Sequence, residues 1–269
     1  MVLMKATVLS LDGNAGREVE LPPQFGEQLR GDLVRHAVHS EQSRRYQPKG
    51  SYIYAGLETT AEYYGRRHAW RQTINTGRSR VPREKIPKGR SGRVLRIPSA
   101  VKGRRAHPPK TSKRIVERIN LKEKNFAMRS AISATTNAEA VKKRGHIFEG
   151  ALPLVADDSL EAVAKAKEAK AVFEKLGLGK DLERARQRRR MRSGRARLRK
   201  GGHRNSRSVL VVVGEDRGVW KAARNLPGVD VVKVGDLTAE LLAPGGEQGR
   251  LAVWTESALE KMRKEELFK

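Results

Sequence analysis

The positive charge of this chain is concentrated in two segments. Residues 66–110 contain 15 Lys and Arg and a single acidic residue, Glu84, whereas residues 184–207 contain 12 Lys and Arg and no acidic residue. The formal net charge is +27, and the remaining 200 residues hold 30 basic and 29 acidic side chains. Because unpaired like charges repel and keep a chain extended, both segments are predicted to bind a polyanion, and nucleic acid is the natural one.

The length of 269 residues allows one large domain or two small ones. Without the two basic segments about 200 residues remain, enough to bury roughly two-thirds of the unfolded surface. The chain has no cysteine, which excludes disulfides, thiolate nucleophiles and cysteine-based zinc sites. No apolar run approaches the roughly 20 residues of a membrane helix, and the start lacks the apolar region of a secretion signal. We therefore expect a soluble cytoplasmic protein.

Strand and helix patterns alternate along the C-terminal third of the chain. The run from Val209 to Val213 is continuously apolar, as expected for a strand that is covered on both faces. Further strands are predicted at 229–234 and 251–254, and helices at 218–225, at 237–242 and from Glu256 onward. This alternation predicts an α/β fold, a three-layer sandwich with a mostly parallel sheet, plus a long basic non-globular loop.

The N-terminal part is predicted to join the same domain. The patterns indicate a strand at 6–9, a helix ending near Ser43, and a long helix or a broken pair of helices from Thr111 or Ser112 through Ile132. They further indicate a helix at 138–143, a strand at 152–156 and a helix at 157–176. We expect one globular domain formed by residues 1–45 and 111–269, an extended basic loop inserted at 46–110, and a second basic segment at 184–207 within the domain.

Residues 46–110 show neither helical nor strand periodicity, and Gly and Pro interrupt them repeatedly. Fixing the backbone of one residue costs about 1–2 kcal/mol, and almost no apolar burial offsets that cost here. A loop of this length inside a compact protein is usually functional or ordered by a partner. Both basic segments are therefore expected to acquire their shape by binding folded RNA.

Aromatic residues are interleaved with the first basic segment. All five tyrosines lie between residues 46 and 64, and Trp70 follows among several arginines. Aromatic rings stack on unpaired bases, and guanidinium groups both stack and bind phosphate. For each tyrosine the alternative of anchoring the loop to the domain stays open, whereas the neighbours of Trp70 favour nucleic acid.

A basic segment that almost lacks acidic residues favours contact with nucleic acid over an ordinary solvated face, although charge alone does not separate RNA from DNA. In the first segment the predicted RNA-binding residues are Arg66, Arg67, His68, Trp70, Arg71, Gln72, Arg78, Arg80, Arg83, Lys88, Arg90, Arg93, Arg96, Lys102, Arg104 and Arg105. In the second they are Arg188, Arg189, Arg190, Arg192, Arg195, Arg197, Arg199 and Arg204. A nuclear localisation signal is an alternative for the second segment, but two dispersed basic segments favour wrapping of RNA.

Residues 214–218 follow a buried strand, where a parallel sheet would place a ligand. They match neither a dinucleotide fingerprint nor a P-loop, and Glu215 and Asp216 would repel a phosphate, so we expect them to start a helix. His36 and His39 share a helix face but have no third metal ligand in view. We expect no catalytic residue, no metal and no cofactor, and we expect that the protein is not an enzyme. The alternatives are an RNA-modifying enzyme that uses the sheet as a cofactor platform and a DNA-compacting protein.

Four stretches resemble the large-subunit ribosomal protein four family in its archaeal and eukaryotic form. They are RRHAWRQ at 66–72, TGRSRVP at 76–82, KEKNFAMRSAISA at 122–134 and GRLAVWTESA at 249–258. The resemblance runs through the whole chain in order, and its most specific part is the pair of stretches in the first basic segment.

The resemblance implies a structural constituent of the large ribosomal subunit. Its α/β domain would lie on the outside of the subunit, and its loop would reach between rRNA helices to the peptide exit tunnel, opposite the large-subunit protein twenty-two. Carried onto this sequence, the tunnel-lining residues would be Trp70, Arg71, Gln72, Thr73, Gly77 and Arg78. The family further implies binding to large-subunit rRNA and to neighbouring ribosomal proteins, a role in subunit assembly, and no homo-oligomer.

Overall fold

The computed structural model describes residues 4–63, 65, 74–87, 91–199 and 201–269. The chain forms two compact units. We call the first, Met1–Arg45 with Val116–Lys269, the body, and the second, Tyr46–Ile115, the insertion.

The body is built on a six-stranded sheet in the order β2-β1-β5-β10-β8-β9. Its strands are β1 (Lys5–Leu9), β2 (Ala15–Glu20), β5 (Leu154–Ala156), β8 (Leu210–Val213), β9 (Asp230–Lys233) and β10 (Ala252–Thr255). Every neighbouring pair is parallel except β1 and β2, which form an antiparallel hairpin. The predicted α/β fold with a mostly parallel sheet is thereby confirmed.

Eight α-helices of the body are described. They are α1 (Gly31–Ser43), α2 (Leu121–Ser133), α3 (Ala138–Lys143), α4 (Ala166–Lys175), α5 (Gly179–Gln187), α6 (Val219–Ala223), α7 (Ala239–Leu242) and α8 (Glu256–Lys264). Side chains in front of several helices cap them, as when Asn137 Oδ1 accepts from the backbone N–H groups of Glu139 and Ala140 at the start of α3. No helix among the described residues combines the length and apolarity needed to span a bilayer.

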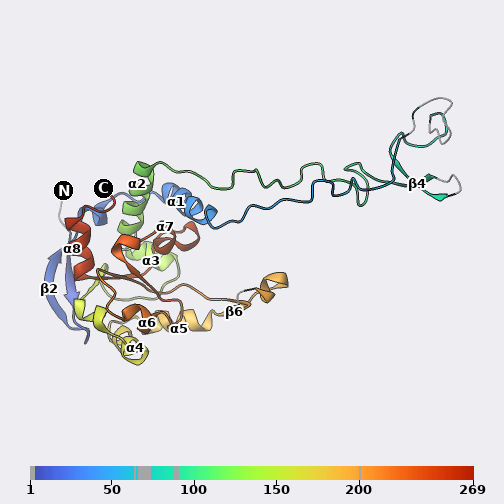
Figure 1. Ribbon diagram of the computed structural model, residues 1–269. Coiled ribbons are helices and arrows are strands. Elements are labelled where there is room, and N and C mark those ends of the chain that lie inside the picture. Colours follow the sequence, from blue (N-terminus) through green and yellow to red (C-terminus); the bar gives the residue numbers. More distant parts are fainter. Residues whose placement is uncertain (1–3, 64, 66–73, 88–90, 200) are drawn as a thin grey trace. The chain divides into compact units, whose positions relative to one another are not determined.

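Apolar side chains cover the sheet on both faces because strand residues alternate between two hydrophobic clusters. In β8, Leu210 and Val212 pack into the first cluster, and Val211 and Val213 into the second. Helices α1, α2, α7 and α8 contribute to the first cluster, and α3 to α6 to the second. Figure 1 shows α1, α2 and α7 on one side of the sheet and α4, α5 and α6 on the other. The body therefore has a core of its own, independent of the insertion.

Helix α2 begins later than its sequence predicts. The predicted start at Thr111 or Ser112 is wrong, because the helix begins at Leu121. The backbone before it is held by α1 instead: Ser43 Oγ accepts from the N–H of Glu117 at 3.0 Å, and Ser40 Oγ donates to the Glu117 carbonyl at 2.8 Å. These serines satisfy the backbone polar groups that a helix would otherwise pair internally.

The described part of the insertion contains one small antiparallel sheet, β3 (Arg83–Lys85) with β4 (Ser91–Val94). A single bridge links Glu62 to Arg83 through two backbone hydrogen bonds of 3.2 Å. Among its described residues Ala61 is the only buried apolar side chain. Burial of apolar surface, which stabilises the body, therefore contributes little to the order of the insertion.

Candidate nucleic-acid interface

Most of the described cations predicted to bind RNA in the insertion are exposed. Six of them form no ion pair among the described residues, namely Arg78, Arg80, Arg93, Lys102, Arg104 and Arg105. The one ion pair described within the insertion joins Lys85 to Glu62 at 2.6 Å. Because none of the six charges has an acidic partner among the described residues, a bound polyanion would stabilise this surface.

The side chains of two predicted RNA-binding residues also form hydrogen bonds within the insertion. Arg96 is half-buried and donates from Nη1 to the carbonyl of Ala61 at 3.0 Å. Arg83 is half-buried as well, and its Nη2 donates to Ser79 Oγ at 3.0 Å. Part of the guanidinium of each residue is thus engaged inside the insertion, which leaves fewer donors for a phosphate.

The tip of the insertion falls largely outside the described residues. This applies to nine of the residues predicted to bind RNA or to line the tunnel: Arg66, Arg67, His68, Trp70, Arg71, Gln72, Thr73, Lys88 and Arg90. Of the tunnel-lining set, Gly77 and Arg78 are described, and both are exposed. Gly77 adopts a φ of 72°, a left-handed conformation that favours glycine.

The described tyrosines of the insertion are exposed. Between 42% and 60% of the surface of Tyr46, Tyr52, Tyr54 and Tyr63 is accessible, whereas Tyr64 lies outside the described residues. The rings of Tyr52 and Tyr54 meet edge to face, with centroids 5.8 Å apart. Rings this exposed add little to the stability of the insertion by burial, which leaves stacking on bases as a role for them.

The second basic segment contains a short hairpin of β6 (Arg190–Met191) and β7 (His203–Arg204), with a 3₁₀ turn at Gly194–Leu198 between the strands. We call residues 188–206 the arm. All eight arginines predicted there to bind RNA are exposed, and none forms an ion pair among the described residues: Arg188, Arg189, Arg190, Arg192, Arg195, Arg197, Arg199 and Arg204. The arm thus presents a second uncompensated positive surface.

Arg184, which lies within the second basic segment, has a structural role. It is buried, and its Nε donates to Asp181 Oδ1 at 2.8 Å within α5. Asp181 is fully buried and also accepts from the backbone N–H of Ile147 at 3.0 Å, while His146 Nδ1 lies 3.2 Å from its carboxylate. This cluster was not predicted from the sequence, although an Asp three residues before an Arg on one helix is a recognisable pairing signal.

The environment fixes the ionisation of the cluster. Burial alone would raise the pKa of Asp181, but hydrogen bonds from His146, Arg184 and Ser208 outweigh burial and hold this pKa well below its usual value. Burial lowers the pKa of His146 despite the attraction of Asp181. At neutral pH, Asp181 is therefore charged, and a neutral His146 donates its Nδ1–H to the Asp181 carboxylate.

Acidification is expected to destabilise the body in two steps. The unfolded chain protonates His146 below about pH 6.5 while the folded protein does not, so the free energy of unfolding falls as the pH drops through this range. Asp181 adds a further loss below about pH 4, where the unfolded carboxyl is protonated first. Urea unfolding measured across this range should show both steps. A His146→Asn variant, whose amide can donate to Asp181, should flatten the first step, and an unchanged slope would contradict the assignment.

The carboxyl edge of the parallel strands is filled by a protein carboxylate. Glu161 is buried, and its Oε1 accepts from the backbone N–H of Gly214 at 2.8 Å, from Thr255 Oγ1 at 2.9 Å and from Ser257 Oγ at 2.6 Å. Asp216 Oδ1 accepts from the N–H groups of Gly218 at 3.0 Å and Trp220 at 3.2 Å, so it lies against the first turn of α6, although the N-cap residue of this helix is Gly218. This edge therefore carries a satisfied structural network at the position where an α/β enzyme would bind its cofactor.

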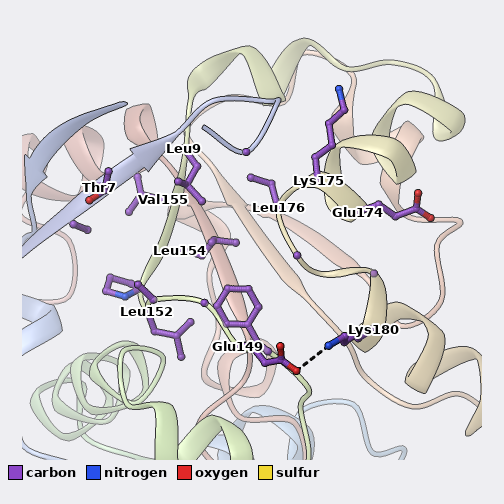
Figure 2. Close-up of a pocket in the computed structure, with 18 of the residues that line it drawn as sticks. Thr7, Leu9, Glu149, Leu152, Leu154, Val155, Glu174, Lys175, Leu176 and Lys180 are labelled. Carbon is purple, nitrogen blue, oxygen red and sulfur yellow. Dashed lines mark hydrogen bonds and ion pairs between the residues drawn. The ribbon is translucent and has the colours of Figure 1, made fainter. Parts of the chain in front are cut away.

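A pocket of about 620 Å³ lies between β1, β5 and the end of α4. Figure 2 shows Leu9, Leu154 and Leu176 on its wall and the ion pair between Glu149 and Lys180 at its rim. The other lining lysines are paired as well, Lys5 with Glu18 and Lys175 with Asp12. A pocket with apolar walls and neutralised lysines does not suit a polyanion, in contrast to the insertion and the arm.

Comparison with known proteins agrees with the resemblance found in the sequence. The family model described as the Ribosomal protein L4/L1 family matches residues 19–265. The large ribosomal subunit protein uL4 of Archaeoglobus fulgidus is 48% identical over 257 residues, which cover 96% of this chain and 97% of that protein. The protein of the same name from Methanocaldococcus jannaschii is 48% identical over 261 residues, which cover 97% and 98%. These matches confirm the resemblance and the prediction that the chain is not an enzyme. The chain belongs to the Ribosomal protein L4/L1 family.

Proposed function

We propose that this protein is a structural constituent of the large ribosomal subunit and binds large-subunit rRNA through the insertion and the arm. The observation that carries the proposal is that 14 of the Arg and Lys residues predicted to bind RNA are exposed on these two segments, and none of the 14 has an acidic partner among the described residues. Arg and Lys that neutralise RNA phosphates release counterions, which provides affinity independent of sequence. The names of the relatives supply the class of RNA, because both are large-subunit proteins.

The two units have different roles in this proposal. The body, with its two apolar clusters, folds alone and serves as an anchor. The insertion, with little apolar burial, is an extended loop that gains most of its order from the rRNA helices around it. The exposed tyrosines and arginines suit stacking on splayed bases and contact with phosphates, which is how proteins recognise irregular RNA.

The insertion reaches the peptide exit tunnel in this arrangement. Its tip, with Gly77 and Arg78 as the described members, would line the tunnel opposite protein twenty-two, one of the neighbouring large-subunit proteins that are its partners. A loop that threads between rRNA helices has to enter before these helices close around it. The protein therefore takes part in assembly of the subunit, in the cytoplasm and as a single copy.

Sedimentation tests the proposal directly. A tagged copy of the full chain, expressed in an archaeal cell, is expected to sediment with the large subunit through a sucrose gradient and to stay there after a high-salt wash. Retention only at low salt would indicate a transiently associated factor and overturn the structural role. In a separate competition at physiological salt, structured large-subunit rRNA should displace duplex DNA. Equal retention of both would favour a DNA-compacting protein instead.

A further inference from the structure

The arm leaves and rejoins the body at one buried polar cluster. On the outgoing side, Arg184 lies on α5, four residues before the arm begins, and binds Asp181 through Nε at 2.8 Å. On the returning side, Ser208 is fully buried and donates from Oγ to Asp181 Oδ2 at 2.6 Å. The Asp181 carboxylate therefore binds a residue on each side of the arm.

Further hydrogen bonds close the same base. Arg184 Nη1 donates to Ser206 Oγ at 3.2 Å, and its Nη2 donates to the carbonyl of Arg207 at 2.8 Å. The fully buried Arg250 donates from Nε to the carbonyl of Ser208 at 2.9 Å and from Nη2 to Asp230 Oδ2 at 2.6 Å. The last residues of the arm and those that follow are thus fixed before the chain enters β8.

Beyond this base, the two strands pair despite unfavourable charges. Arg190 lies opposite Arg204, Met191 lies opposite His203, and the backbone N–H of Arg192 donates to the carbonyl of Gly202 at 2.8 Å. Like charges that face each other across a hairpin are destabilising, and an isolated two-stranded hairpin is marginal in water. The pairing of β6 with β7 therefore depends on a constraint at its base.

The pairing also sorts the side chains. Because successive residues of a strand point to opposite faces, the paired Arg190 and Arg204 share one face of the hairpin, and Met191 and His203 share the other. Arg192 follows β6 directly, is exposed and, like Arg190 and Arg204, has no acidic partner among the described residues. Guanidinium groups gathered in this way suit the phosphates of an RNA backbone. This hairpin differs from the expectation that both basic segments lack a shape of their own.

We propose that the buried Asp181 cluster is a positioning device that holds the arm as a hairpin before RNA arrives, so that Arg190, Arg192 and Arg204 form a ready-made phosphate site. The inference rests on the proposed rRNA-binding function and assigns the two basic segments different mechanisms. The insertion is ordered mainly by RNA, whereas the arm is ordered mainly by the body. A binding site that is ordered in advance loses less conformational entropy on binding.

Hydrogen–deuterium exchange of the RNA-free full chain tests the order of the arm. The amides of the β6–β7 hairpin, including that of Arg192, are expected to exchange at least about tenfold more slowly than in an unstructured peptide. A Ser208→Ala variant, which removes one hydrogen bond to Asp181, should raise exchange in the hairpin and leave β8 and β10 protected. Random-coil exchange of the hairpin in the unmodified protein would overturn the proposal without bearing on whether the protein binds rRNA.

A double-mutant cycle tests whether the cluster acts through the arm. Ser208→Ala is expected to weaken binding to large-subunit rRNA about fivefold. In an Arg190→Gln, Arg204→Gln background the same substitution should change affinity less than about twofold, because the site that it positions has been removed. Ser130→Ala is the matched control, since Ser130 is a buried serine of α2 whose Oγ accepts from the backbone N–H of Arg30 at 2.6 Å.

The outcomes separate the two proposals. Equal effects of Ser208→Ala in both backgrounds, or an equal loss of affinity in Ser130→Ala, would show that the cluster acts only through general stability and would overturn the positioning role. If the hairpin is protected from exchange but the unmodified protein does not bind rRNA, the proposed function would be contradicted instead. Measurements well below the melting temperature of each variant keep unfolding out of the comparison.

Discussion

Replacing residues 58–102 with two glycines is expected to leave the body folded and to remove most of the salt-dependent affinity for large-subunit rRNA. The ends chosen for this deletion already meet: a Cβ on Gly56 would lie 2.6 Å from the backbone nitrogen of Arg104. The body keeps both hydrophobic clusters, none of whose members lies in the insertion. The melting temperature should therefore change little.

The expected loss of affinity follows from counterion release. The deleted residues include 12 Lys and Arg and 3 Glu. If half of the 12 basic residues contact phosphates, the slope of log affinity against log salt becomes shallower by about 4–5. Filter binding or fluorescence titration between about 50 and 200 mM salt covers the range in which such a change is easily measured.

Charge and length can be separated with two further variants. Changing the six exposed cations to Gln, at positions 78, 80, 93, 102, 104 and 105, keeps the loop length and should reproduce much of the loss of slope. Lys165, Lys170 and Lys175 on the body form ion pairs with Glu168, Glu174 and Asp12, and their substitution by Gln serves as the control. An equal change of slope in the control, or an unchanged slope in the deletion, would rule out the insertion as the main phosphate-binding element.

The parallel part of the sheet was predictable because its strands are covered on both faces. The apolar run Val209 to Val213 predicts a buried strand, and in the structure it forms β8, whose side chains divide between the two clusters. The predicted helix at 138–143 has the bounds of α3, where Asn137 provides a clear N-cap. Strong burial and local capping thus made these elements visible in the sequence.

Elements held mainly by distant partners were not predictable in the same way. Strand β2 is almost entirely exposed and carries no alternation of apolar and polar residues, so only its pairing with β1 defines it. The start of α2 depends on Ser40 and Ser43, which lie far away in sequence. Periodicity cannot show such contacts, because they depend on the tertiary arrangement.

The candidate interface was predicted better by its residue types than by its local structure. The absence of acidic residues near the arginines of the arm predicts an uncompensated surface, and the eight arginines are indeed exposed. The same count of charges included Arg184 in the basic segment, although its side chain is buried against Asp181. Composition does not distinguish an arginine that reaches solvent from one that pairs inside, since this depends on which helix face meets the core.

An Asp181→Asn substitution is expected to destabilise the body by about 3–5 kcal/mol, the usual cost of removing one partner of a buried ion pair. Both side chains are almost inaccessible, with relative exposures of 0% for Asp181 and 7% for Arg184. Asparagine keeps the size of the side chain but leaves the guanidinium as an uncompensated buried charge. Thermal unfolding should show a melting temperature lower by about 10 °C.

Asp32→Asn is the matched control for this effect. Asp32 also pairs with an arginine, Arg30, at 2.7 Å, and the guanidinium holds its pKa down to about 2. Both partners are exposed, so water screens the pair and its loss should hardly change the melting temperature. Equal decreases in melting temperature in the two variants would mean that burial does not increase the contribution of the Asp181 pair to stability.

A double variant separates the unpaired charge from the lost hydrogen bonds. If Asp181→Asn destabilises because Arg184 is left charged and buried, then adding Arg184→Met should restore part of the lost stability, since no buried charge remains. If the hydrogen bonds to His146, Ser208 and the N–H of Ile147 matter more, the second substitution should bring no recovery. Recovery of stability combined with increased exchange in the hairpin would show that Arg184 is retained to order the arm and contributes little to the stability of the body.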